Sequence, residues 1–91
     1  MTSNYAIVRD VLARHLQCEP SAIRPWLHFE GELDMTPLEI VLIAAELEAA
    51  LDLDIPPDGL AAVSTVVDLV RLVGKARARE AAKPRPMDRT A

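Results

Sequence analysis

The chain of 91 residues has few aromatic side chains, one cysteine and no long apolar run. Its three aromatic residues (Tyr5, Trp26 and Phe29) leave the interior to be built from Leu, Ile, Val and Ala. The lone Cys18 excludes an internal disulfide framework and a multi-thiolate metal site. No stretch of about 18 apolar residues occurs, which excludes a membrane span, and no basic-then-apolar signal segment opens the chain. We therefore expect a cytoplasmic protein.

The charges are distributed unevenly along the chain. The net charge is −4, and residues 30–58 carry nine carboxylates with no lysine or arginine. After Asp68, seven basic residues stand against Glu80 and Asp88. An acidic middle segment repels nucleic acid and favours a basic partner surface. We therefore expect a protein partner and no nucleic acid.

The side chains that carry chemistry are sparse. His15, His28 and Cys18 are the only soft metal ligands, and their spacing matches no metal motif. No nucleophile, base and acid are brought together by a motif, and the three glycines are isolated. We expect no metal, no catalytic residue and no enzyme activity, and we interpret Cys18 as a small buried apolar residue.

The apolar periodicity predicts helices. Spacings of three and four in the first segment trace one helical face, formed by Tyr5, Val8, Val11, Leu12 and Leu16. Residues 18–34 contain prolines and a glycine among apolar anchors, which indicates a long ordered loop. Within it, Trp26 is interpreted either as a cover over the core or as a partially exposed contact residue.

The clearest helix start is Thr36-Pro37-Leu38-Glu39. Thr36 can cap the helix, Pro37 suits the first helical position, and Glu39 can complete a capping box. Helix formers continue to Leu51, a short helix is predicted at 58–62, and Ser64 is predicted to cap a last helix. No stretch alternates as a strand would.

These segments predict an all-α fold, a small four-helix bundle with three main helices, one short helix and a long first loop. We expect the bundle to occupy residues 1–80 and a flexible basic tail to occupy residues 81–91.

The pattern resembles the acyl carrier protein family without a gap from about Val8 to Val73. The resemblance implies the acyl-carrier type of bundle. The residues that carry it are Val11-Leu12, Leu16, Ile23, Phe29, Leu33, Leu38-Glu39, Glu46-Leu47-Glu48, Leu51-Asp52, Ile55-Pro56, Val63-Ser64-Thr65-Val66 and Val70.

The family attaches 4′-phosphopantetheine to a serine in an Asp-Ser-Leu motif at the start of the second helix. In this register the motif positions are Thr36, Pro37 and Leu38, and the serine position is Pro37, which has no hydroxyl. The attachment position is therefore interpreted as degenerate, and we expect 4′-phosphopantetheine to be absent. The alternative is a working carrier protein modified at Thr36.

The second helix also carries the face that the family presents to its enzymes. One stripe along the helix is formed by Leu38, Leu42, Ala45 and Ala49. A second stripe, which we expect to face the core, is formed by Ile40, Ala44, Leu47 and Leu51. The resemblance implies partner enzymes that bind through a basic patch, and we predict the contact residues to be Leu38, Glu39, Leu42, Glu46 and Glu48. Together these features indicate a non-carrying interaction or scaffold module in a fatty-acid, polyketide or related thioester pathway. The oligomeric state is left open.

Overall fold

A computed structural model describes residues 3–82 of the chain. These residues form an all-α fold of four α-helices and one short 3-10 helix. In chain order the elements are α1 (Asn4–Leu16), η1 (Pro20–Ala22), α2 (Pro37–Leu51), α3 (Pro57–Ala61) and α4 (Val66–Ala82). The prediction of three main helices, one short helix and a long first loop is confirmed. Residues 83–91 of the predicted basic tail lie outside the described residues.

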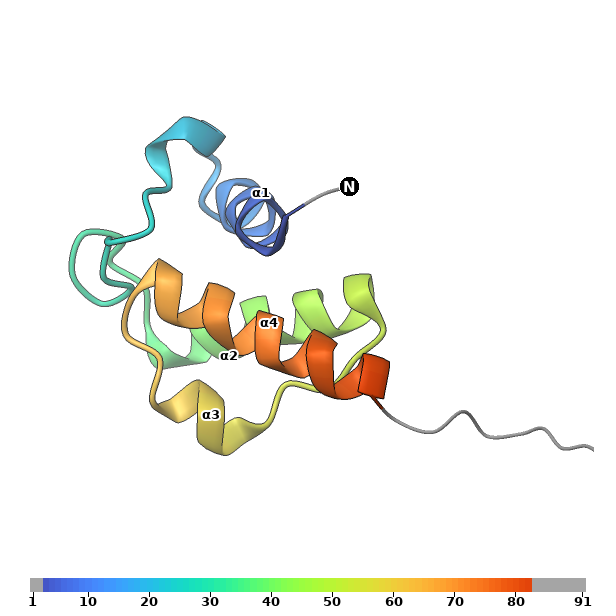
Figure 1. Cartoon of the computed structure of the whole chain (residues 1–91). Coiled ribbons are helices and arrows are strands. Elements are labelled where there is room, and N and C mark those ends of the chain that lie inside the picture. Colours follow the sequence, from blue (N-terminus) through green and yellow to red (C-terminus); the bar gives the residue numbers. More distant parts are fainter. Residues whose placement is uncertain (1–2, 83–91) are drawn as a thin grey trace, which may run out of the picture.

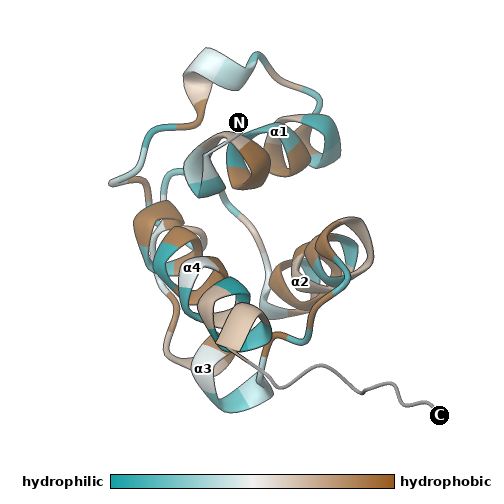
Figure 2. Ribbon diagram, turned by 45° about the vertical axis from the view of Figure 1, so that its right-hand side comes forward, coloured by the Kyte–Doolittle hydropathy of each residue, from teal (hydrophilic) through white to brown (hydrophobic). Residues whose placement is uncertain are grey.

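The helices enclose one core. α1 lies across the pair formed by α2 and α4, and α3 lies on the side of that pair away from α1 (Figure 1). The apolar positions, brown in Figure 2, fall mainly on α1, α2 and α4. The side chains that are almost completely buried include Val8, Leu12, Ile23, Phe29, Ile43, Leu47, Val66, Leu69 and Val73. An aliphatic core with a single central aromatic ring, Phe29, agrees with the composition.

α1 begins where the sequence offers a cap. The Ser3 hydroxyl oxygen accepts the Ala6 N–H at 3.0 Å, and α1 ends at Gln17 in the left-handed conformation with φ of 55°. Cys18 follows this turn and is exposed. The interpretation of Cys18 as a buried residue was therefore wrong, because the chain has left the helix and runs along the surface before η1.

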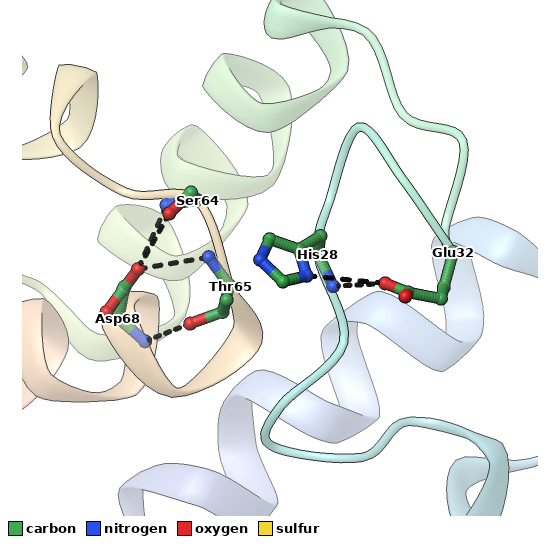
Figure 3. A network of polar contacts seen from close by, with 5 residues as sticks. All are labelled: His28, Glu32, Ser64, Thr65 and Asp68. Carbon is green, nitrogen blue, oxygen red and sulfur yellow. Dashed lines mark hydrogen bonds and ion pairs between the residues drawn. The ribbon is translucent and has the colours of Figure 1, made fainter.

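The last helix begins one residue later than predicted. Thr65 and Asp68 bond reciprocally across the first turn, since Thr65 Oγ1 accepts the Asp68 N–H at 3.3 Å and Asp68 Oδ2 accepts the Thr65 N–H at 3.1 Å. Ser64, predicted as the cap, instead donates its own N–H and hydroxyl to Asp68 Oδ2 (Figure 3). The cap is Thr65, because an acid three residues after it completes the capping box.

Backbone hydrogen bonds hold the long loop against the start of α4. The Phe29 N–H donates to the Ser64 carbonyl at 2.9 Å, and the Val66 N–H donates to the Leu27 carbonyl at 3.0 Å. His28 and Thr65 pair as an isolated antiparallel bridge. The loop is thus ordered by hydrogen bonds to a segment distant in sequence, and it ends at the start of α2.

Candidate functional site

The start of α2 is closed by a complete capping box. Thr36 Oγ1 accepts the Glu39 N–H at 3.2 Å, and Glu39 Oε1 accepts the Thr36 N–H at 2.9 Å. Pro37 occupies the first helical position and is exposed. Its missing N–H costs nothing there, because the first N–H groups of a helix have no partner within the helix.

Glu39 also joins α2 to α1. Its Oε2 lies 3.3 Å from Nε2 of His15, and both side chains are partly buried. The Thr36 backbone N–H, followed by the His15 side chain, holds the pKa of the Glu39 carboxyl below its usual value. The ionised carboxylate is therefore the form that this junction favours.

The outward side of α2 is apolar at its N-terminal half. Leu38 is 67% exposed, Val41 52% and Leu42 50%, so three large aliphatic side chains face solvent on neighbouring positions of one helix. Leu42 lies one turn beyond Leu38, and the exposed Glu46 lies one turn beyond Leu42. The structure thus places three of the five predicted contact residues together on one exposed stripe.

The other two predicted contact residues are half-buried and hydrogen-bonded within the bundle. Glu39 belongs to the capping box and contacts His15. Glu48 Oε2 accepts the Ile55 N–H at 2.7 Å and so holds the segment that follows α2. These two carboxylates bond backbone groups of the domain itself, which the sequence pattern does not reveal.

A groove runs beside this stripe, between α2 and residues 54–63. Its volume is about 640 Å³, and its apolar lining includes Pro37, Val41 and Ala45 from α2 together with Ile55, Leu60 and Ala61. Neither the groove nor the exposure of Val41 was predicted from the sequence. The available signal was that Val41 stands three residues after Leu38 and next to Leu42, on the same side of a helix.

Attachment of 4′-phosphopantetheine requires a hydroxyl group near the start of α2. Residue 37, where the resemblance places the attachment serine, is a proline and has no hydroxyl. The Thr36 hydroxyl is exposed and adjacent, and its oxygen accepts the Glu39 N–H. Ser64 and Thr65 are both hydrogen-bonded to Asp68 (Figure 3). The residues present do not fit attachment at residue 37 itself.

The remaining sequence candidates do not converge on a second site. His28 lies 3.5 Å from Glu32 on the exposed loop (Figure 3), and Trp26 is 65% exposed with the Arg24 guanidinium 5.8 Å from its ring centre. Within residues 3–82, no three His, Cys, Asp or Glu side chains are grouped as metal ligands. In the same residues, no helix combines the length and apolarity needed to cross a membrane.

Comparison with known families matches residues 6–73 to the family model described as a phosphopantetheine attachment site. The match begins in α1 and ends within α4, so it spans every element between them and more than half of the chain. Domains of this kind interact with partner enzymes and are generally not catalytic.

This match contradicts one expectation from the sequence. The family carries a 4′-phosphopantetheine prosthetic group, so the expected absence of that group is not supported. The expectation rested only on the absence of a hydroxyl at residue 37. The adjacent Thr36 still carries a hydroxyl. By the extent of the match, the chain belongs to the phosphopantetheine attachment-site family of carrier-protein domains.

Proposed function

We propose that this carrier-family domain acts as a protein-interaction or scaffold module in a fatty-acid, polyketide or related thioester pathway, without esterification of residue 37. The observation that carries the proposal is the start of α2, where Pro37 stands at the first helical position inside a complete capping box. A helix start that keeps its cap keeps the outward face of the helix in place. In the proposal, Pro37 is the counterpart of the attachment serine, and the face of α2 carries the function.

We define the docking face as Leu38, Glu39, Leu42, Glu46 and Glu48. Leu38 and Leu42 are exposed and supply apolar contact, and fully burying a leucine side chain contributes about 1.5–3 kcal/mol. Glu46 supplies an exposed carboxylate one turn further along α2. Glu39 and Glu48 act through their negative charge, since their carboxylates are held by backbone N–H groups.

The proposed partners are enzymes that recognise carrier proteins through a basic patch. Residues 30–58 include all of α2 and carry nine carboxylates with no basic residue. Such a segment attracts a basic surface and orients it before contact. Apolar contact by Leu38 and Leu42 then contributes to the lifetime of the complex.

A broadly acting phosphopantetheinyl transferase is a suitable probe, because the serine that it modifies in the family lies at the start of the second helix. Its affinity for the native chain is compared with that for a Leu42→Ala, Glu46→Ala double variant by calorimetry. We expect roughly tenfold weaker binding of the double variant, equivalent to about 1.4 kcal/mol. Arg71→Ala, an exposed change on α4, is the control and should bind as the native chain does. Unchanged binding of the double variant contradicts the proposed face.

A second candidate function is a working carrier protein modified at Thr36. The exposed Thr36 hydroxyl directly precedes Pro37, and the family match favours a prosthetic group. Its hydroxyl oxygen caps α2, so esterification there requires the capping bond to Glu39 to be given up. Because esterification of Thr36 would cost this capping bond, we rank a carrier modified at Thr36 below the interaction module.

Intact mass after co-expression with the same transferase separates the two candidates. Pro37→Ser is expected to gain one phosphopantetheine, because it restores a serine hydroxyl at the first position of α2. A gain in the native chain that disappears in Thr36→Asn assigns the attachment to Thr36 and overturns the first candidate. Asparagine suits this comparison since it caps helices well and has no hydroxyl.

A further inference from the structure

α4 carries an outward face that the proposed function does not use. We infer that this face, together with Trp26 of the long loop, binds the headgroups of an anionic lipid surface and holds the domain there peripherally. The inference goes beyond the proposed function, because it concerns a different side of the molecule. The docking face on α2 stays free when the lipid surface is bound.

Three basic side chains follow one another along α4 at intervals of one turn. We define the basic face as Arg71, Lys75 and Arg79, which are all exposed and share one side of the helix. In residues 3–82, none of the three takes part in an ion pair. Arg77, the other basic residue of α4, donates to Asn4 Oδ1 of α1 at 2.7 Å and is not part of this face. The basic face therefore presents three unpaired positive charges to the solvent.

The surroundings of the basic face suit a charged surface better than a protein partner. Ala78 and Ala82 lie beside it and are exposed. The carboxylate of Asp68, which precedes the face on α4, is bound by the N–H groups of Ser64 and Thr65, both at 3.1 Å. The sequence after Ala82 adds three basic residues and one acidic residue. Alanines offer a protein partner no large anchor to bury, whereas an anionic lipid surface attracts the charges themselves.

The apolar contribution comes from the long loop. Trp26 is 65% exposed, and the Arg24 guanidinium lies 5.8 Å from its ring centre. The Val67 N–H, one turn before Arg71, donates to the Pro25 carbonyl at 2.8 Å, so this part of the loop lies at the N-terminal end of α4 (Figure 1). Tryptophan is enriched where membranes meet water, because its ring is apolar and its N–H is polar. Trp26 and Arg24 thus extend the basic face with side chains that suit a headgroup layer.

The carboxylates of the chain are concentrated elsewhere. Residues 30–58 include all of α2 and carry nine carboxylates with no basic residue. The buried side chains of α2, such as Ile43, and of α4, such as Val73, face one core, so the outward faces of the two helices point in different directions. Attraction to a charged surface falls off within a Debye length, about 8 Å at physiological ionic strength. A lipid surface at α4 therefore meets the basic face first, despite the net charge of −4.

The probe is a vesicle of equal parts phosphatidylserine and phosphatidylcholine, added to the full-length chain. Trp26 is the only tryptophan of the chain, so its fluorescence reports the contact directly. We expect its emission to move to shorter wavelength with these vesicles and to stay unchanged with vesicles of phosphatidylcholine alone. Binding measured by co-sedimentation with the vesicles should weaken at least tenfold between about 0.05 and 0.5 M salt, because salt screens the charges.

Lys75→Gln and Arg14→Gln provide matched variants that remove the same charge. Arg14 is exposed and directly precedes His15, whose ring contacts Glu39 of α2, so it lies outside the basic face. Lys75→Gln is expected to weaken vesicle binding roughly fivefold, the contribution of one basic side chain near the lipid surface. Arg14→Gln should leave binding unchanged within about twofold, because its charge lies farther from the surface than a Debye length. Lys75→Arg keeps the charge and should bind as the native chain does.

The comparisons of lipid and salt use the native chain, so they decide the question even where a variant fails to fold. The inference is overturned by equal binding to both kinds of vesicle, by tryptophan emission that no vesicle changes, or by equal effects of Lys75→Gln and Arg14→Gln. Concentration-dependent sedimentation of the chain alone that Lys75→Gln removes assigns the basic face to a second copy instead. Tighter binding of duplex DNA than of vesicles assigns it to nucleic acid. The transferase titration contains no vesicles and decides the proposed function separately.

Discussion

Nε2 of His15 near the end of α1 lies 3.3 Å from Oε2 of Glu39, whose other oxygen accepts the Thr36 N–H. One carboxylate therefore both closes the first turn of α2 and fixes that turn to α1. The exposed Leu38 lies directly before Glu39 in the same turn. The orientation of the docking face thus depends on a junction that is formed inside the bundle.

The first prediction concerns the cap of α2. Thr36→Ala removes the hydroxyl that accepts the Glu39 N–H and is expected to lower the free energy of unfolding by about 1 kcal/mol. Thr36→Asn should restore most of this loss, because asparagine also caps helices well. Urea unfolding followed by circular dichroism measures both variants. Equal stability of the alanine variant and the native chain would show that the capping bond contributes little.

The second prediction concerns acid stability through Asp68. The backbone N–H groups of Ser64 and Thr65, followed by their side chains, hold the pKa of Asp68 below its ordinary value. Because the pKa in the folded state is the lower one, the stabilisation is complete above the unfolded pKa of about 3.9. It is lost as the pH falls through the folded pKa. Asp68→Asn keeps an acceptor and removes this titration.

The free energy of unfolding of the native chain should therefore exceed that of Asp68→Asn near neutral pH. The difference should shrink as the pH falls below about 4. Glu39 also has a lowered pKa, but it is present in both proteins and cancels in the comparison. Urea midpoints measured at several pH values test the idea, and a difference that stays constant with pH contradicts it.

The positions of the helices were predictable because local signals and burial agree. The start of α2 was predicted from Thr36, Pro37 and Glu39, and the predicted capping box is present in the structure. The stripe chosen for the core is buried at Ile40, Ala44 and Leu47. Ile43 joins them, since α2 packs over more than one row of side chains. Periodicity predicts the buried side of a helix well when its neighbours cover only that side.

The groove and the use of the carboxylates were not predictable, because they depend on how separate segments meet. Glu48 and Ile55 are seven residues apart, and their hydrogen bond exists only after the chain turns at Asp52. Val41 looks like another apolar residue of α2 until α3 is placed opposite it. Cys18 was misplaced for the same reason, since its apolar position in a family pattern carries no information on the local path of this loop.

The third prediction compares two adjacent residues of α2. Ile43 is 1% exposed and Leu42 is 50% exposed. Ile43→Ala is expected to lower the free energy of unfolding by about 2–5 kcal/mol, because it leaves a cavity in the core. Leu42→Ala should change stability by no more than about 0.5 kcal/mol, as surface changes usually do. Similar losses for both variants would mean that Leu42 is packed in solution and is not available to a partner.

The fourth prediction separates the two aromatic residues of the long loop. Phe29 is 1% exposed, whereas Trp26 is 65% exposed. The backbone of Phe29 also joins the loop to the start of α4 through the Ser64 carbonyl. Phe29→Ala is expected to destabilise the fold by about 3–5 kcal/mol through loss of buried area and cavity formation.

Trp26→Ala is expected to cost less than about 1 kcal/mol, because most of its ring already contacts water. Thermal unfolding of the two variants at one protein concentration provides the measurement, and tryptophan fluorescence of the native chain provides the control. An emission maximum typical of a water-exposed indole agrees with the exposed ring. A large loss of stability on removing Trp26 would instead mean that the loop covers the core through this side chain. Trp26 would then be a structural residue, and its ring would not be available for contact with a partner or a second copy.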